Sequence, residues 1–215
     1  MLVATRLAAG FRDEVIISPD PRICMQRGSQ CSAHIVFLRS DLPNIPFHSE
    51  PLLNGHGPYQ GTSLEQRKKM LYSFNILVQR LPIKYATFAY RRSEFDDLAK
   101  LTARMKRDVS GLPFDHLDFF QAFDDVKVYY DNGQDIVKKA LDQSFGFALS
   151  KGVLERRKTS MTGYRLEQAA DYLCTIELAA VKYAAKEDGE TYNKFFGGIG
   201  PFKKNWLKQA RRKAI

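Results

Sequence analysis

The order of apolar segments in this chain predicts an α/β protein, in which helices pack on a β-sheet. From residue 64 onward, segments with helical periodicity alternate with short β-branched and aromatic segments, in the order α-β-α-β-α-β-α-α. Alternation of this kind is typical of a sheet covered by helices. With 215 residues and a hydrophobic content of 44%, the chain is large enough to bury a sizeable core, which favours one folded domain.

The first part of the chain has the weakest pattern. Residues 13–17 are compatible with a strand, and residues 34–38 with a strand or one helical turn, because periodicity cannot separate the two in such short apolar runs. Residues 42–58 (LPNIPFHSEPLLNGHGP) contain too many prolines for a helix or a central strand. We therefore expect an irregular loop there.

The first clear helix follows this loop. Thr62-Ser63-Leu64-Glu65 matches a capping box, with Thr62 as the predicted N-cap, and the apolar face continues to about Leu81. Ser93-Glu94-Phe95-Asp96 opens a second helical region, to about residue 123, with a break expected near Pro113. Further helices are predicted at residues 134–149 and 164–186 and in a basic segment opened by Pro201; strands are predicted at residues 83–90, 126–130 and 152–158.

Asp131 is the first candidate site residue. It follows the predicted strand 126–130 and precedes an Asn132-Gly133 turn. Strand ends of this kind lie at the rim of a sheet, where α/β proteins place their chemistry. Equally, aspartate is a common turn residue, and Asp131 is suited to capping the helix that begins near Gln134. Both interpretations stay open.

Asp171 is the second candidate, inside the largely apolar helical segment 166–174. A carboxylate on such a face is costly to bury unless it is paired or binds a metal, so either an ion pair with Arg165 or Lys182 or a metal site is expected. If this helix packs across the sheet, Asp131 and Asp171 converge at one sheet edge. Two carboxylates placed in this way suit Mg²⁺ or Mn²⁺, as in two-metal nucleases.

Two further groups are candidates for binding metal or phosphate. His48 and Glu50 lie in the predicted loop, from which both can reach a bound ion, although a loop histidine is also an ordinary surface residue. Arg91-Arg92 directly follows a predicted strand and can bind phosphate. Motifs for nucleotide-binding loops, serine hydrolases and zinc sites are absent from the sequence.

Charge points to a polyanionic partner. The net charge is +9, with a sequence pI near 9.4. Basic residues crowd the C-terminal segment, at positions 203, 204, 208, 211, 212 and 213. Such an excess favours contact with nucleic acid, although it also fits a solvated helix face with a basic tail. Without a long apolar run or a signal peptide, and with three cysteines at no metal-ligand spacing, we expect a cytoplasmic protein with no membrane segment.

Five motifs resemble one known family. They are Phe47–Leu53 (FHSEPLL), Arg80–Tyr85 (RLPIKY), Val128–Gln134 (VYYDNGQ), Tyr164–Asp171 (YRLEQAAD) and Lys194–Gly197 (KFFG). From about Pro46 to the C-terminus, the chain resembles the bacterial domain-of-unknown-function 3800 family. This resemblance implies a ribonuclease H-like mixed sheet flanked by helices, with Asp131 and Asp171 at two of the acidic metal positions and His48 lining the site.

Relatives in that family begin with a strand of sequence F-x-D-E-S-G-D. The most similar segment of this chain is Asp13-Glu14, which lacks the Ser-Gly that follows in the relatives. We therefore expect residues 1–45 to be a divergent or truncated segment, and residues 46–215 to form the family-like domain. The leading hypothesis is a Mg²⁺- or Mn²⁺-dependent nuclease, with Asp131, Asp171 and Glu50 as metal ligands and His48, Arg91 and Arg92 near the substrate. The alternative is a non-catalytic module that binds nucleic acid or protein.

Overall fold

The computed structural model describes the backbone of residues 2–9, 14–18, 47–81, 83–121, 125–130, 154–158 and 165–215. Side chains are described for residues 47–81, 83–91, 93–119 and 168–215. The chain divides into two compact units. The first unit comprises Met1–Met25, Ile83–Ala170 and Ile215, and the second comprises Gln26–Pro82 and Asp171–Ala214.

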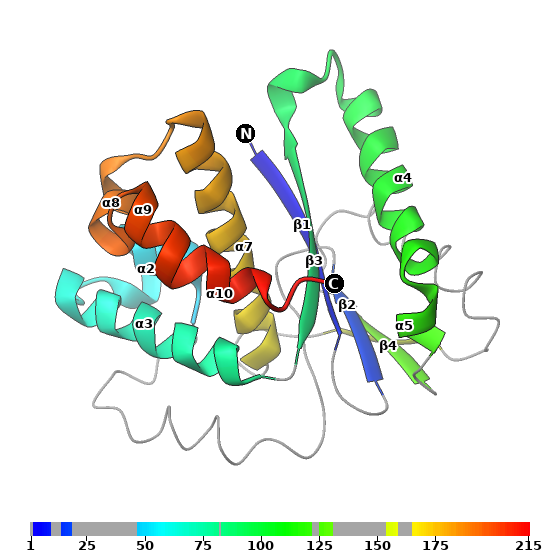
Figure 1. Cartoon of the computed structure of the whole chain (residues 1–215), viewed down its shortest axis with the longest axis horizontal. Helices are drawn as coiled ribbons and strands as arrows, with labels where there is room; N and C mark the ends of the chain where they lie inside the picture. The colour runs from blue at the N-terminus through cyan, green and yellow to red at the C-terminus, as the bar shows by residue number, and fades with distance from the viewer. Residues whose placement is uncertain are drawn as a thin grey trace. The chain divides into compact units, whose positions relative to one another are not determined.

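The first unit contains a five-stranded sheet (Figure 1). Its strands are β1 (Leu2–Ala9), β2 (Glu14–Ser18), β3 (Lys84–Arg91), β4 (Asp125–Tyr130) and β5 (Leu154–Lys158), in the order β3-β1-β2-β4-β5. β1 is antiparallel to both β2 and β3, whereas β2, β4 and β5 are parallel. Strands β2 to β5 lie close to the predicted segments, and β1 was not predicted.

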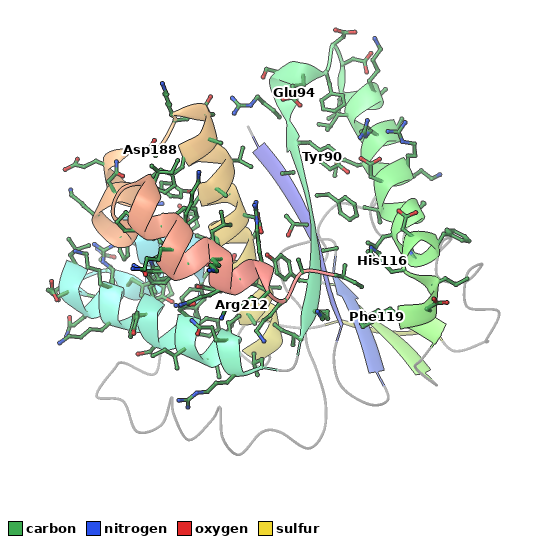
Figure 2. The ribbon with its side chains drawn as sticks, in the orientation of Figure 1. Tyr90, Glu94, His116, Phe119, Asp188 and Arg212 are labelled. Carbon is green, nitrogen blue, oxygen red and sulfur yellow. The ribbon has the colours of Figure 1, made fainter. Side chains whose placement is uncertain are left out.

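Helix α4 (Leu98–Asp115) packs beside β3 and is followed by α5 (Leu117–Gln121). The side chain of Asp97 caps α4 by accepting the N–H of Lys100 at 2.7 Å. Between β3 and α4, the Tyr90 hydroxyl donates to Asp108 at 3.1 Å. Tyr90 is labelled on β3 in Figure 2. The break predicted near Pro113 occurs slightly later: Pro113 lies within the last turn of α4, and the helix ends at His116.

The regular elements described in the second unit are helices, joined by short turns and loops. Its elements are α2 (Ser49–Asn54), the 3₁₀ turn η1 (Gly57–Tyr59), α3 (Leu64–Arg80), α7 (Arg165–Ala185), α8 (Glu190–Phe196), α9 (Ile199–Phe202), the π-helical segment η3 (Lys203–Leu207) and α10 (Lys208–Arg211). Helix α7 begins in the first unit and contributes its residues from Asp171 onward to the second.

An aromatic cluster forms the centre of the second unit. The rings of Phe47 and Phe74 stack with centroids 4.0 Å apart, and Tyr172 of α7 approaches both rings at about 6 Å. The Tyr172 hydroxyl donates to Asn75 of α3 at 2.6 Å. Rings of this size bury large apolar areas, so the cluster joins α3, α7 and the segment that leads into α2.

The predicted ribonuclease H-like mixed sheet flanked by helices is wrong as a description of this chain. The residues with described side chains are 73% helical and include one strand, β3, with no partner strand among them. His48, Glu50 and Asp171 all belong to the helical second unit and not to the unit that contains the strands. The alternation of apolar segments cannot reveal this division, because periodicity predicts the type of each element but not which elements pack together in one core.

Two local predictions also need correction. The segment 42–58 was expected to be irregular, yet α2 occupies Ser49–Asn54. Pro51 falls in the first turn of α2, where a backbone N–H has no acceptor within the helix, so its missing N–H costs little. The N-cap of α3 is Ser63 and not Thr62, and its capping box pairs Ser63 with Gln66.

None of the helices in the described ranges combines the length and the apolar character needed to cross a membrane.

Candidate functional site

Asp171 caps helix α2 from a distant part of the chain. The first N–H groups of a helix need outside acceptors, and the N-cap residue His48 supplies none from its side chain. Instead, the Asp171 carboxylate accepts the backbone N–H of Ser49 at 2.5 Å. Asp171 is only 6% exposed, and a buried carboxylate is costly unless it is paired. The positive end of the α2 dipole therefore helps to hold this charge.

The same carboxylate oxygen faces the imidazole of His48. The distance from His48 Nδ1 to Asp171 Oδ2 is 3.4 Å, and the His48 side chain is 32% exposed. A carboxylate beside Nδ1 favours the tautomer that carries its proton there. Within the described residues, Nε2 has no hydrogen-bond partner. Asp171 thus orients the half-buried imidazole, and Nε2 is left available to bind another group.

Tyr59 fixes the backbone of His48. Its buried hydroxyl accepts the His48 N–H at 3.0 Å. Burial raises the pKa of Tyr59 to about 12; the hydrogen bond from His48 opposes this rise and the charge of Asp171 adds to it. Tyr59 is therefore a neutral phenol at physiological pH, and its role here is to position His48.

Glu50 lies on the exposed side of α2. Its Oε1 accepts from Asn54 Nδ2 at 2.8 Å and is 3.0 Å from His56 Nε2. The hydrogen bond with His56 is the main influence on the pKa of Glu50, and it outweighs partial burial to hold that pKa below its ordinary value. The charge of His48 contributes in the same direction, although more weakly. Glu50 is an ionised carboxylate within the electrostatic reach of His48.

The other end of α2 is held by Arg67 of α3. Its Nη1 donates to the carbonyls of Leu52 and Leu53 at 2.7 and 2.9 Å. Its guanidinium also lies over the Phe195 ring, 5.5 Å from the centroid. Beyond these carbonyls, Gly55 ends the helix in the left-handed region, at φ +74°. A short helix that is fixed at both ends is a firm support for His48.

The structure brings some of the predicted site residues together. His48 and Asp171 form a pair, and Glu50 lies two residues beyond His48 but binds His56. Arg91 ends β3 in the other unit, and Arg92 begins the 3₁₀ turn that follows, with its side chain outside the described set. Asp131 also lies outside the described residues, so its convergence with Asp171 stays a prediction.

The predicted divalent-metal site includes Asp131, which lies outside the described residues. No group of three or more His, Cys, Asp or Glu residues among them could hold a metal ion. The Asp171 oxygen nearest His48 is already committed to the Ser49 N–H, whereas Mg²⁺ sites of two-metal enzymes use several carboxylate oxygens. Mg²⁺ or Mn²⁺ binding involving Asp131, Asp171 and Glu50 therefore remains a prediction.

Sequence reasoning missed Ser49, Tyr59 and Arg67 as parts of this site. Ser-Glu-Pro at positions 49–51 is a sound helix start, because small, acidic and proline residues all suit a first turn, and this signal could have revealed α2. No local signal identifies Tyr59 or Arg67, because their roles depend on tertiary contacts.

Comparisons with protein-family models, curated proteins and solved structures found no match for this chain.

Proposed function

We propose that this chain is a hydrolase that cleaves phosphodiester bonds in nucleic acid, with the imidazole of His48 as its general acid–base group. The observation that carries this proposal is the 3.4 Å approach of His48 Nδ1 to the buried carboxylate of Asp171. A histidine oriented by a carboxylate, with its other nitrogen open to a substrate, is a recurrent arrangement for proton transfer in enzymes.

The chemistry that we propose is a single displacement at phosphorus. Neutral His48 accepts a proton from an attacking water through Nε2 as the new P–O bond forms. The bond to the leaving oxygen breaks on the opposite side of phosphorus, and that oxygen takes a proton from solvent. The imidazolium returns its proton to solvent, which restores neutral His48. Asp171 acts as a positioning residue: it holds the ring and stabilises its transient positive charge. General acid–base catalysis of this kind contributes about 10²- to 10⁴-fold to a rate.

Nucleic acid is the substrate that best suits the charge of the chain. A net charge of +9 attracts polyanions and speeds their encounter with the protein. Mg²⁺ or Mn²⁺, if bound, would supply a Lewis acid for the phosphate oxygens.

Cleavage of fluorescently labelled RNA, DNA and RNA–DNA hybrid tests this proposal directly, with Mg²⁺, with Mn²⁺ and with chelator. We expect His48→Gln to lower the rate by about 100-fold or more. The matched control is His56→Gln, because His56 is the neighbouring exposed histidine, and its rate should stay within about twofold of wild type. Absence of cleavage under every condition, or full activity of His48→Gln, would overturn the proposal.

Asp171→Asn separates positioning from simple support of the fold. The amide oxygen can still accept the Ser49 N–H, but it cannot stabilise an imidazolium. We therefore expect a folded variant with a lower kcat and an altered pH–rate profile. A loss of activity that merely tracks a loss of folded protein, with an unchanged pH profile, would assign Asp171 a structural role only.

A second candidate function is a non-catalytic module that binds nucleic acid. It is favoured by a comparison of two distances: Asp171 Oδ2 lies 2.5 Å from the Ser49 N and 3.4 Å from His48 Nδ1, so helix capping is the closer of these two contacts. This candidate predicts salt-sensitive, metal-independent binding without cleavage, unchanged in Asp131→Asn. Cleavage that depends on His48 would exclude it.

A further inference from the structure

A basic face with an exposed aromatic ring lies where α3 meets the C-terminal helices of the second unit. The two segments are joined along their length by the Tyr72–Trp206 ring contact, by hydrogen bonds from Asn75 and Gln79 to Gln209, and by a hydrogen bond from Lys213 to the carbonyl of Leu81. These contacts join segments about 130 residues apart in the sequence. The side chains along both edges of this seam therefore form one continuous surface.

Tyr72 is the aromatic centre of this surface. It is 58% exposed, although it is a large aromatic residue in a unit with a well-packed core. Its ring contacts the buried Trp206 edge-on, with centroids 6.4 Å apart and planes at 82°. Trp206 thus supports the tyrosine from beneath, and much of the Tyr72 ring stays available to a partner.

Both helical segments that meet at Tyr72 carry exposed basic residues. Lys68 and Lys69 lie one helical turn before it on α3, and Lys208 and Arg212 lie one turn apart across the seam. Arg212 is visible at the end of α10 (Figure 2). Between residues 199 and 215 the chain has six basic residues and no acidic one. Among the described residues, Lys69, Lys208 and Arg212 have no ion-pair partner.

We infer that this face binds single-stranded nucleic acid, with Tyr72 stacking on a base and the surrounding lysines and arginine contacting phosphates. Exposed aromatic rings set among basic residues are the usual elements of single-strand recognition, because every unpaired base offers a face for stacking. Paired bases in a duplex do not, so the aromatic ring favours a single strand. The inference rests on the proposed function in naming its substrate class, although binding at this face requires no cleavage.

The test is fluorescence anisotropy with an oligothymidylate of about 15 nucleotides, a length that exceeds a typical single-strand site. The full chain carries His48→Gln, so that the oligonucleotide stays intact during the measurement. Tyr72→Leu keeps an apolar cover on Trp206 but removes stacking, and we expect it to weaken binding about tenfold. Tyr72→Phe keeps the aromatic ring, and its affinity should stay within about twofold of the chain that carries His48→Gln alone.

Charge is tested with matched pairs. Lys208→Gln with Arg212→Gln should lower the slope of log affinity against log salt by about 1.4, because about 0.7 is expected for each phosphate contact to a single strand. Lys106→Gln with Arg107→Gln removes the same charge from exposed positions on α4 and should leave most of the slope intact. A duplex of equal length should bind less tightly and should not respond to Tyr72→Leu.

Equal affinity of the His48→Gln chain with and without Tyr72→Leu, or equal slopes for the two charge pairs, would overturn the inference. If binding responds to these changes but the wild-type chain cleaves nothing, the binding face is supported and the proposed hydrolase is ruled out. If cleavage depends on His48 while binding is unaffected by the changes at Tyr72, Lys208 and Arg212, the hydrolase is supported and the binding face is ruled out.

Discussion

Asp171 and Arg67 hold opposite ends of one six-residue helix. The anionic Asp171 accepts the first N–H of α2, and the cationic Arg67 donates to two of its last carbonyls. Each charge thus lies at the end of the helix dipole that it complements. Isolated helices of this length are unstable in water, so α2 depends on these two side chains and on its buried face.

The first prediction concerns the N-terminal contact. Asp171→Ala leaves the buried N–H of Ser49 without its acceptor, and we expect a loss of about 1–3 kcal/mol in the free energy of unfolding. Asp171→Asn should lose less, because its amide oxygen can accept the same bond. Urea unfolding followed by circular dichroism measures both variants. Asp118→Ala, an exposed carboxylate on α5, is the control. Wild-type stability in Asp171→Ala would contradict the capping role.

The second prediction concerns the side chain of Ser49. Its hydroxyl is buried and has no hydrogen-bond partner in the described part of the chain, whereas its backbone N–H binds Asp171. Removing an unsatisfied buried hydroxyl is close to neutral or stabilising. Ser49→Ala should therefore unfold at the wild-type midpoint or slightly above it in the same urea experiment. A large loss of stability would show that the hydroxyl has an essential partner.

The third prediction isolates the contact between Gly55 and Arg67. Both Gly55 and Gly61 have positive φ angles, +74° and +79°. A Cβ on Gly55 would come within 3.0 Å of Arg67 Cζ, whereas a Cβ on Gly61 would meet nothing within 4 Å. Gly55→Ala and Gly61→Ala share a backbone cost of about 1 kcal/mol, so any additional loss in Gly55→Ala measures displacement of Arg67. Equal losses in thermal unfolding would show that Arg67 moves aside freely.

The fourth prediction concerns acid stability. The pKa of Glu50 lies below its ordinary value of 4.5, mainly because of the hydrogen bond with His56. A carboxyl whose pKa is lower in the folded state stabilises the protein above its unfolded pKa, and this contribution is lost as pH falls through the folded value. Glu50 is largely exposed, so the contribution is about 0.5 kcal/mol or less.

Melting temperatures of wild type and Glu50→Gln between about pH 7 and pH 3 test this point. The wild type should be slightly more stable near neutrality, and the two curves should converge below the ordinary pKa of Glu50. Glu65→Gln, which removes an exposed carboxylate from α3, is the control. A gap that widens as pH falls would contradict the sign of the shift.

Sequence patterns located most elements and misjudged how they assemble. The helix at 165–185 and the strand at 84–91 lie close to the predicted segments, because the helix has a long apolar periodicity and the strand is rich in aromatic residues. Helix α2 escaped prediction because the several prolines of residues 42–58 argue against a helix, although a first turn tolerates Pro51. The two compact units cannot be read from the sequence, since no local pattern shows that the residues from Asp171 onward group with residues 26–82.

The candidate site was predictable in part. The apolar helix around Asp171 indicated a buried carboxylate that needed a partner, and burial is confirmed. The partner is a backbone N–H 122 residues earlier, which no spacing rule could identify. His48 was chosen through a resemblance and a loop position, and its pairing with Asp171 is visible only in three dimensions.

The bond between Ser49 and Asp171 also makes one amide proton of this chain a reporter. A short hydrogen bond to a charged acceptor moves an amide resonance downfield and slows exchange of that proton with solvent. The Ser49 signal in a nuclear magnetic resonance spectrum would therefore record whether α7 and the start of α2 remain docked. It would do so at a single atom, next to the histidine whose chemistry is in question.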